Sequence, residues 1–312
     1  KDMRMSNTQI VPSNCAISPY YTPSNHASIY SLFLYLLIMI PISSSLSILY
    51  LSLNRMSTDA RMNIAILALL AGSIFGLSCL LIRILKLHSP QMMLITGIVF
   101  FFIFTYIKWL LYVSFITAWY KREVNYSDFG LSAYFTYFMF YLRSPIDFLS
   151  MILGINKEGT WTFGSDASTA SPVNGILLTL FWLIELGYDA LFFIYLPRQQ
   201  TLEPFIESEN AWAIHEKKKP IILQHFSIVG QKLAIEQDPS ILLEKNVQFA
   251  QTGPMFVRLE FYHSKDYSEC YISLREYKKN QKGQYVGTAN KLQFLRVPSD
   301  LIANLYAKAQ NV

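Results

Sequence analysis

Charged residues are scarce in this sequence, and their scarcity is uneven. Asp, Glu, Lys and Arg together make up 15% of the 312 residues, whereas an ordinary soluble domain contains about 25%. From Arg198 onward charged residues are frequent, but long stretches before it contain none. This distribution excludes a single ordinary soluble domain and predicts a membrane part followed by a water-soluble part.

Cysteines and the signatures of common catalytic sites are also scarce. The three cysteines, Cys15, Cys79 and Cys270, show no pairing pattern, so the sequence predicts no disulfide framework. None of the five histidines shares a helical face with another metal-binding residue at ligand spacing. The sequence contains no zinc-protease, serine-hydrolase, phosphate-loop or dinucleotide motif. We therefore expect no catalytic residue, no metal and no cofactor.

The net charge of +5 is mild and is spread over both halves of the chain. No basic stripe interleaved with aromatic residues occurs, so we expect no nucleic-acid partner. A mildly basic balance suits a protein that lies beside anionic lipid head groups. The expected partners are a lipid bilayer and either other protein subunits or further copies of the chain.

Long apolar runs are abundant. A membrane-spanning helix needs about 20 mostly apolar residues. Four runs satisfy this requirement: residues 29–53, 62–82, 92–119 and 173–196. The sequence therefore predicts four transmembrane helices.

A fifth apolar stretch, between the third and fourth of these runs, is interrupted by Arg143. Ser144 as the N-cap, Pro145 at the first helical position and Asp147 in the first turn predict a new short helix that ends at Gly154. A re-entrant or interfacial helix pair is the favoured prediction. The alternative is one tilted span in which Arg143 and Asp147 pair at positions i and i+4.

The hydrophobic period changes to two in the last third of the chain. Val257, Leu259 and Phe261 alternate with charged residues in 255–263, and 270–277 repeats the pattern, which indicates half-buried antiparallel strands. Further predicted elements are strands at 221–229, 233–237 and 291–297, a hairpin turn at 280–283, and a terminal helix from Pro298 to about residue 310.

The predicted fold class is a polytopic α-helical membrane bundle, with four firm transmembrane helices and one broken or re-entrant segment, followed by a soluble β-rich α+β domain with a terminal helix. The predicted domains are a polar N-terminal tail (1–28), a transmembrane helical domain (29–198), a linker (199–219) and a cytoplasmic β-rich domain (220–312).

Lysine and arginine near the last span indicate its orientation. Arg198, Lys217, Lys218 and Lys219 follow this span, whereas the loop before it carries Lys157 alone. The positive-inside rule places the C-terminal domain in the cytoplasm, and we expect a bacterial inner membrane. The three consecutive lysines are expected to contact lipid head groups or a partner. Four spans would put both termini inside, and five would put the N-terminus outside.

Three charged residues lie within predicted spans. Lys108 is near the centre of the third, and Glu185 and Asp189 share one face of the last at positions i and i+4. Charges at such depth are candidates for function. The sequence allows a structural ion pair or subunit contact, a proton or ion relay, or a Lys108 that reaches the membrane surface because its helix is displaced. Arg143 and Asp147 are further intramembrane candidates.

Gly72 and Gly76 form a GxxxG pattern in the second span, which permits close approach of another helix.

Taken together, the patterns favour a non-enzymatic membrane subunit or scaffold whose cytoplasmic domain binds partners. The alternative is a small oligomeric transporter, or a protein that conducts ions or protons, built around Lys108, Glu185 and Asp189. A membrane enzyme and a ligand sensor are further possibilities.

Overall fold

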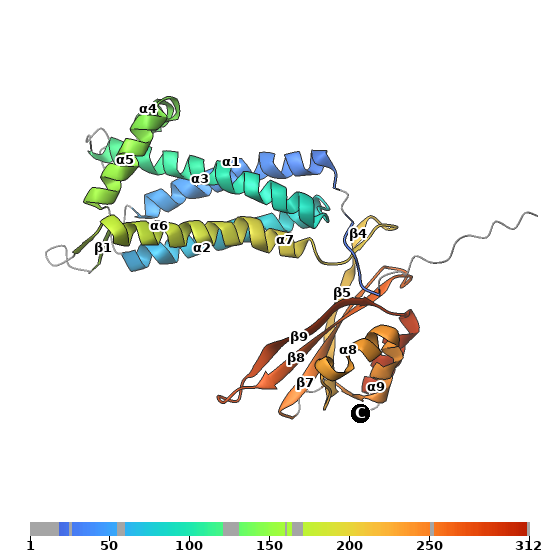
Figure 1. Ribbon diagram of the computed structural model, residues 1–312. Coiled ribbons are helices and arrows are strands. Elements are labelled where there is room, and N and C mark those ends of the chain that lie inside the picture. The colour runs from blue at the N-terminus through green and yellow to red at the C-terminus, as the bar shows by residue number, and fades with distance from the viewer. Residues whose placement is uncertain are drawn as a thin grey trace, which may run out of the picture. The chain divides into compact units, whose positions relative to one another are not determined.

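The computed structural model describes residues 19–24, 27–54, 60–120, 131–159, 161–163, 171–249 and 253–310 (Figure 1). The chain divides into two compact units. Pro23–Phe205 form a helical unit. Ile206–Val312, together with the described part of the segment that ends at Thr22, form a sheet unit.

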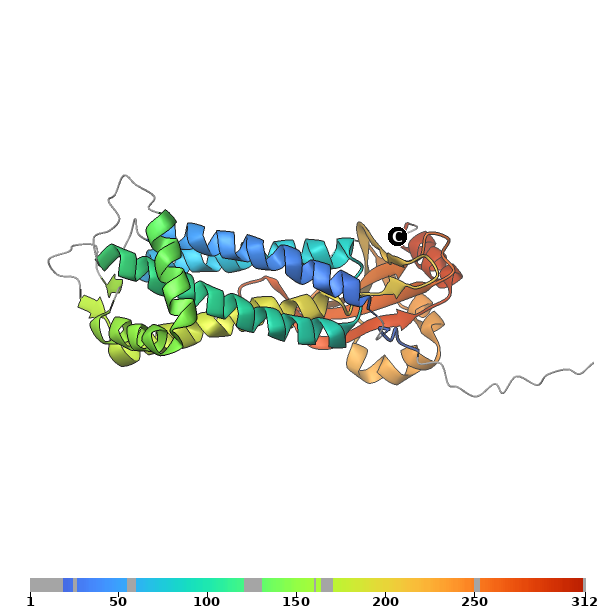
Figure 2. The ribbon, with the colours of Figure 1, turned by 90° about the horizontal axis from the view of Figure 1, so that it is seen from above.

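Four long helices run side by side in the helical unit (Figures 1 and 2). They are α1 (Ile29–Asn54), α2 (Ala60–Ile84), α3 (Pro90–Tyr120), and α6 (Gly175–Ala190) with its continuations η1 (Leu191–Tyr195) and α7 (Leu196–Gln200). Each contains a segment long and apolar enough, by length and composition, to cross a membrane. The prediction of four long apolar helices is confirmed.

Several serine hydroxyl groups of α1 form hydrogen bonds within their own helix. In α1, the side chains of Ser44, Ser47 and Ser52 donate to the carbonyl oxygens four residues earlier, at 2.7–2.9 Å. Such bonds let serine occupy an apolar helix without an unpaired polar group. Between helices, Tyr35 and Ser78 form a buried hydrogen bond of 2.7 Å that joins α1 to α2.

The interrupted apolar stretch forms two helices, α4 (Leu131–Arg143) and α5 (Pro145–Glu158), bent by 113° at their junction. They lie across the end of the helical unit where β1 (Trp161–Phe163) pairs with β2 (Ser171–Val173) (Figure 1). The pair is either a broken span or a re-entrant loop by its geometry.

Two details of the prediction for this segment are wrong. Arg143 and Asp147 lie on different helices with exposed side chains, so they are not an i, i+4 pair of one tilted helix. The second helix continues past Gly154 to Glu158 and ends at Gly159, whose φ of 80° is one that glycine adopts more readily than other residues.

The sheet unit contains a five-stranded antiparallel sheet in the order β6-β5-β7-β8-β9. Its strands are β5 (Ile214–Gln224), β6 (Asn246–Gln248), β7 (Met255–His263), β8 (Cys270–Lys279) and β9 (Tyr285–Arg296); the short β3 (Phe205–Ile206) and β4 (Ala211–Trp212) pair separately. Helices α8 (Ile228–Gln237), η2 (Pro239–Glu244) and α9 (Ser299–Gln310) cover one face and bury the core (Figure 1).

The predicted alternating strands, the hairpin turn and the terminal helix are confirmed. The strand predicted at 221–229 is confirmed only as far as Gln224, since α8 begins at Ile228, and the strand predicted at 233–237 is wrong. That segment belongs to α8. Ile228 and Ile235, seven residues apart, are buried, while Leu233 is 68% exposed. Burial at this spacing is the pattern of a helix, and contact with the sheet decides it over the short local alternation.

The N-terminal segment adds to the outer edge of the sheet at β9. The backbone N–H of Tyr21 donates to the carbonyl of Phe294 at 2.9 Å, and that of Arg296 donates to the carbonyl of Pro19 at 2.7 Å. The Tyr20 hydroxyl donates to the Glu236 carboxylate on α8. The sequence alone predicted only a polar tail here.

Candidate functional site

The three charged residues of the long apolar helices meet in one cluster, which we call the charge triad. Lys108 lies on α3, and Glu185 and Asp189 lie one turn apart on α6. The Lys108 ammonium donates to Glu185 Oε1 at 3.1 Å and also to Asp189 Oδ2. The i, i+4 spacing of the carboxylates is what lets one ammonium reach both.

The triad is closed from its surroundings. The exposed fractions are 5% for Lys108, 8% for Glu185 and 2% for Asp189. Removing charges from water is costly unless each is paired, and here each carboxylate contacts the ammonium. With both carboxylates ionised the triad has a formal charge of −1, because it contains two carboxylates and one ammonium group.

Aromatic side chains pack around the triad. The rings of Trp109 and Trp182 meet edge to face with centroids 4.8 Å apart, and the Lys108 ammonium lies 5.5 Å from the centroid of the Phe104 ring. The adjoining cavity, lined in part by Tyr50 and Tyr112, has a volume of only about 20 Å³. That is room for about one water molecule.

The helix departs from α-helical geometry immediately after the triad. Residues Leu191–Tyr195 form a π-helical turn, η1, two residues beyond Asp189. A Cβ atom built on Gly97 of α3 would lie 2.7 Å from the Phe193 carbonyl oxygen of this turn. Glycine at that position therefore permits the backbones of α3 and η1 to approach. π-helical turns occur frequently at functional sites.

The other predicted site residues lie apart from the triad. Arg143 and Asp147 are exposed at the junction of α4 and α5. Gly72 and Gly76 are exposed, and no described atom comes within 4 Å of a Cβ built on either, so the GxxxG face does not pack on another described helix. The backbone of Lys217, Lys218 and Lys219 lies in β5, but their side chains fall outside the described part of the chain.

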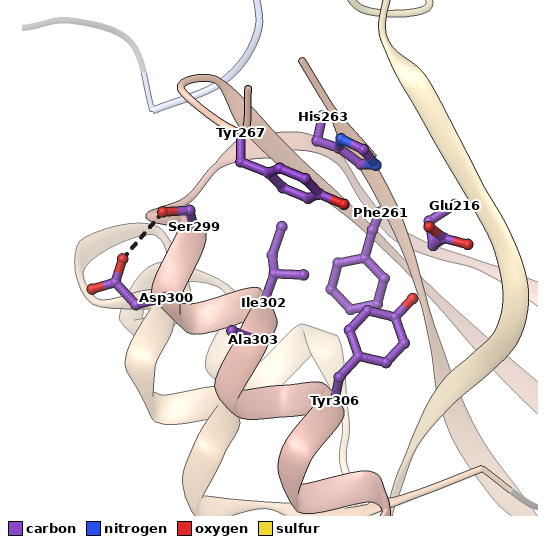
Figure 3. A pocket seen from close by; sticks show the side chains of 9 residues that line it. All are labelled: Glu216, Phe261, His263, Tyr267, Ser299, Asp300, Ile302, Ala303 and Tyr306. Carbon is purple, nitrogen blue, oxygen red and sulfur yellow. Dashed lines mark hydrogen bonds between the residues drawn. The ribbon is translucent and has the colours of Figure 1, made fainter. Parts of the chain in front are cut away.

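Sequence reasoning missed a second group of side chains, which line a cavity in the sheet unit (Figure 3). They come from β5, β7, the β7–β8 turn and the first eight residues of α9. No short motif relates these residues, because they are drawn from segments as far apart as Glu216 and Tyr306. Within the described ranges, no group of three or more His, Cys, Asp or Glu residues is arranged to hold a metal ion.

Comparisons with protein-family models, with curated proteins and with solved structures found no match to this chain. The functional argument therefore stands on the geometry of the chain itself.

Proposed function

We propose that the chain is a non-enzymatic integral membrane subunit or scaffold of a larger membrane assembly, whose sheet unit binds partners. The observation that supports this most directly is the closure of the charge triad. The Lys108 ammonium contacts both carboxylates, and the cavity beside them has room for only about one water molecule. Such an arrangement is better suited to a structural contact that holds α3 and α6 together than to a path for ions.

The surface of the long helices supports a membrane location. Large apolar side chains face outward from them: the exposed fractions are 56% for Leu37, 73% for Leu69, 66% for Phe102, 83% for Ile176 and 58% for Leu183. In water, so much exposed apolar area would cause aggregation. A bilayer or partner subunits would remove it from water.

The N-terminal segment supports an even number of crossings. Pro19, Tyr20 and Tyr21 bond to β9 and α8, so the segment before α1 and the domain after α7 belong to one folded body. Both must lie on the same side of the membrane, which requires an even number of crossings. We therefore propose four crossings, with the α4–α5 pair re-entrant or interfacial.

The side of the membrane on which the sheet unit lies is proposed from the positions of lysine and arginine. Arg198 lies in the last turn of the last long helix, and the three lysines from Lys217 to Lys219 follow that helix; positive residues near span ends favour the cytoplasm. The sheet unit and the N-terminus are therefore proposed to be cytoplasmic, in a bacterial inner membrane. The lysines there are proposed to contact anionic lipid head groups or a partner.

A second candidate function is a small oligomeric transporter or proton-conducting protein. Two observations favour it: the triad has one carboxylate more than it has cations, and a π-helical turn follows Asp189. A proton on one carboxylate would neutralise the cluster, and π-helical turns occur frequently at functional sites.

Substitutions in the triad separate the two functions. Lys108→Met leaves two uncompensated buried carboxylates and is expected to destabilise the protein by about 3–5 kcal/mol. The triple variant Lys108→Met, Glu185→Leu, Asp189→Leu removes every charge and is expected to recover most of that stability and to retain assembly. Lys157→Met, at an exposed lysine, is the matched control. Thermal unfolding and the size of the complex in mild detergent are the measurements.

The same variants test conduction. On the scaffold proposal, the protein alone in liposomes gives no proton or ion flux, and Glu185→Gln and Asp189→Asn singly remain in a stable complex. Flux from the unmodified protein that either single substitution abolishes would overturn the scaffold proposal in favour of the second candidate.

A further inference from the structure

The sheet unit contains a cavity of about 400 Å³ beside the first eight residues of α9 (Figure 3). Its walls are formed mainly by Phe261 and His263 of β7, Tyr267 of the β7–β8 turn, and Ile302 and Tyr306 of α9. The volume lies within the range of small-molecule sites, and the lining combines aromatic surface with a few polar groups, as such sites do.

His263 lines this cavity and carries an unsatisfied hydrogen-bond acceptor. The residue is only 5% exposed. Its Nδ1 lies 2.7 Å from the carbonyl oxygen of Ser264, which can only accept, so Nδ1 carries the proton in the neutral ring. Nε2 is then an acceptor, and it is buried without a hydrogen-bond partner among the described residues. Buried acceptors of this kind normally have a donor.

The aromatic rings form flat walls. The Tyr267 ring stacks on His263 with centroids 4.1 Å apart and an angle of 6° between planes, and the Tyr306 ring lies 5.1 Å from Phe261. The β7–β8 turn holds Tyr267 in place at a φ of 60°. In that turn, Ser264 and Ser268 donate to the Asp266 carboxylate, and these bonds lower its pKa to about 2.

The charged side chains among the nine that line the cavity are both acidic, Glu216 and Asp300. Burial raises the pKa of Tyr306 to about 12, with the negative charge of Glu216 and the nearby Tyr267 contributing. Figure 3 shows the Glu216 carboxylate, the hydroxyls of Tyr267 and Tyr306 and the His263 imidazole directed toward one region, whereas Asp300 points away to bond with Ser299.

We propose that this cavity is a binding site for a small organic cation that carries N–H groups, such as an ammonium, amidinium or guanidinium compound. One N–H donates to His263 Nε2, the positive charge lies near the Glu216 carboxylate, and the body of the ligand packs on the rings of Tyr267 and Tyr306. Aromatic faces attract cations, so the aromatic rings that line the cavity and the Glu216 carboxylate favour the same class of ligand. The proposal does not depend on the function proposed for the helical unit.

Paired probes of similar shape test the charge requirement. Benzamidinium and phenethylammonium are the cations, with benzamide and 2-phenylethanol as their neutral counterparts. Each is titrated by calorimetry into the full chain in detergent micelles. We expect saturable binding of at least one cation, at least about tenfold tighter than its neutral counterpart, because a hydrogen bond to a charged group contributes more than a neutral one.

Substitutions at the cavity test the location. Glu216→Gln keeps the size of the side chain and is expected to weaken cation binding by about tenfold or more. His263→Phe keeps an aromatic ring but removes Nε2, and is expected to weaken it as well. The controls are Glu260→Gln, on the neighbouring position of β7 that faces away from the core, and His225→Asn, at an exposed histidine. Both are expected to leave affinity unchanged.

The proposal is overturned if neither cation binds saturably, if cations and neutral probes bind equally, or if Glu216→Gln weakens binding no more than Glu260→Gln. Because Glu216→Gln is nearly isosteric, its result holds even if His263→Phe fails to fold.

Discussion

Three glycines of the long apolar helices, Gly72, Gly76 and Gly97, differ in what surrounds them. The first two form the motif that the sequence analysis singled out, yet both face open space within the described part of the unit. Gly97 belongs to no motif, but it faces the backbone of η1. A glycine pattern shows where close approach is permitted, and only the arrangement of helices shows where it occurs.

Substitution of these glycines by alanine measures the difference. In Gly97→Ala, the new Cβ would lie 2.7 Å from the Phe193 carbonyl oxygen, so α3 or η1 must move. We expect a loss of about 1–3 kcal/mol. Gly72→Ala and Gly76→Ala are the matched controls and are expected to be neutral or slightly stabilising, because alanine favours a helix more than glycine does. Thermal unfolding in detergent micelles is the measurement, and equal midpoints for all three variants would contradict the packing described.

The charge triad was partly accessible from sequence. The spacing of Glu185 and Asp189 predicted a shared face, and the depth of Lys108 predicted a countercharge. The sequence left open whether Lys108 reaches the membrane surface instead. In the structure the Lys108 ammonium contacts both carboxylates between α3 and α6.

At the level of elements, the strongest sequence signals gave the most accurate predictions. Long apolar runs and sustained alternation predicted α1, α2, α3, β7 and β8 well, because each pattern extends over many residues. The segment 233–237 was misread because five residues of local alternation are too few to distinguish a strand from one face of a helix. Burial of Ile228 and Ile235 against the sheet decides in favour of α8.

The N-terminal segment is an element that local pattern could not reveal. Its backbone bonds go to β9, and its side-chain contact goes to α8, more than 200 residues away along the chain. Burial and the hydrogen bond to Glu236 raise the pKa of Tyr20 above its usual value. The phenol is protonated at neutral pH in either case, and the raised pKa extends its ability to donate to more alkaline pH.

A double-mutant cycle tests this contact. Tyr20→Phe and Glu236→Gln, singly and together, are expected to show a coupling of about 1 kcal/mol, at the low end for a hydrogen bond to a charged group because both side chains are partly exposed. Tyr30→Phe, at a residue 73% exposed, is the control. The free energy of unfolding of the full chain is the measurement, and additive single effects would show that the two residues do not interact.

At the level of the whole molecule, the membrane topology is the main consequence of the N-terminal contact. The four-crossing proposal places positions 127 and 169 on the same, non-cytoplasmic side, whereas five crossings would place position 127 in the cytoplasm. We expect reporter fusions after Ser127 and after Thr169 to give the same, external signal. A cytoplasmic signal after Ser127 with an external one after Thr169 would favour five crossings, and would also bring the N-terminal contact into question.

The sequence by itself determined the division into a helical and a strand-rich part, the four long apolar helices and the alternating strands, because each depends on the composition or period of one continuous segment. Tertiary structure decided what depends on distant segments. It joined Tyr20 to Glu236, closed Lys108 between two carboxylates, left Gly72 and Gly76 open, and gathered Glu216, His263 and Tyr306 around one cavity. Contacts between segments far apart in the chain are set by packing, and no local pattern encodes them.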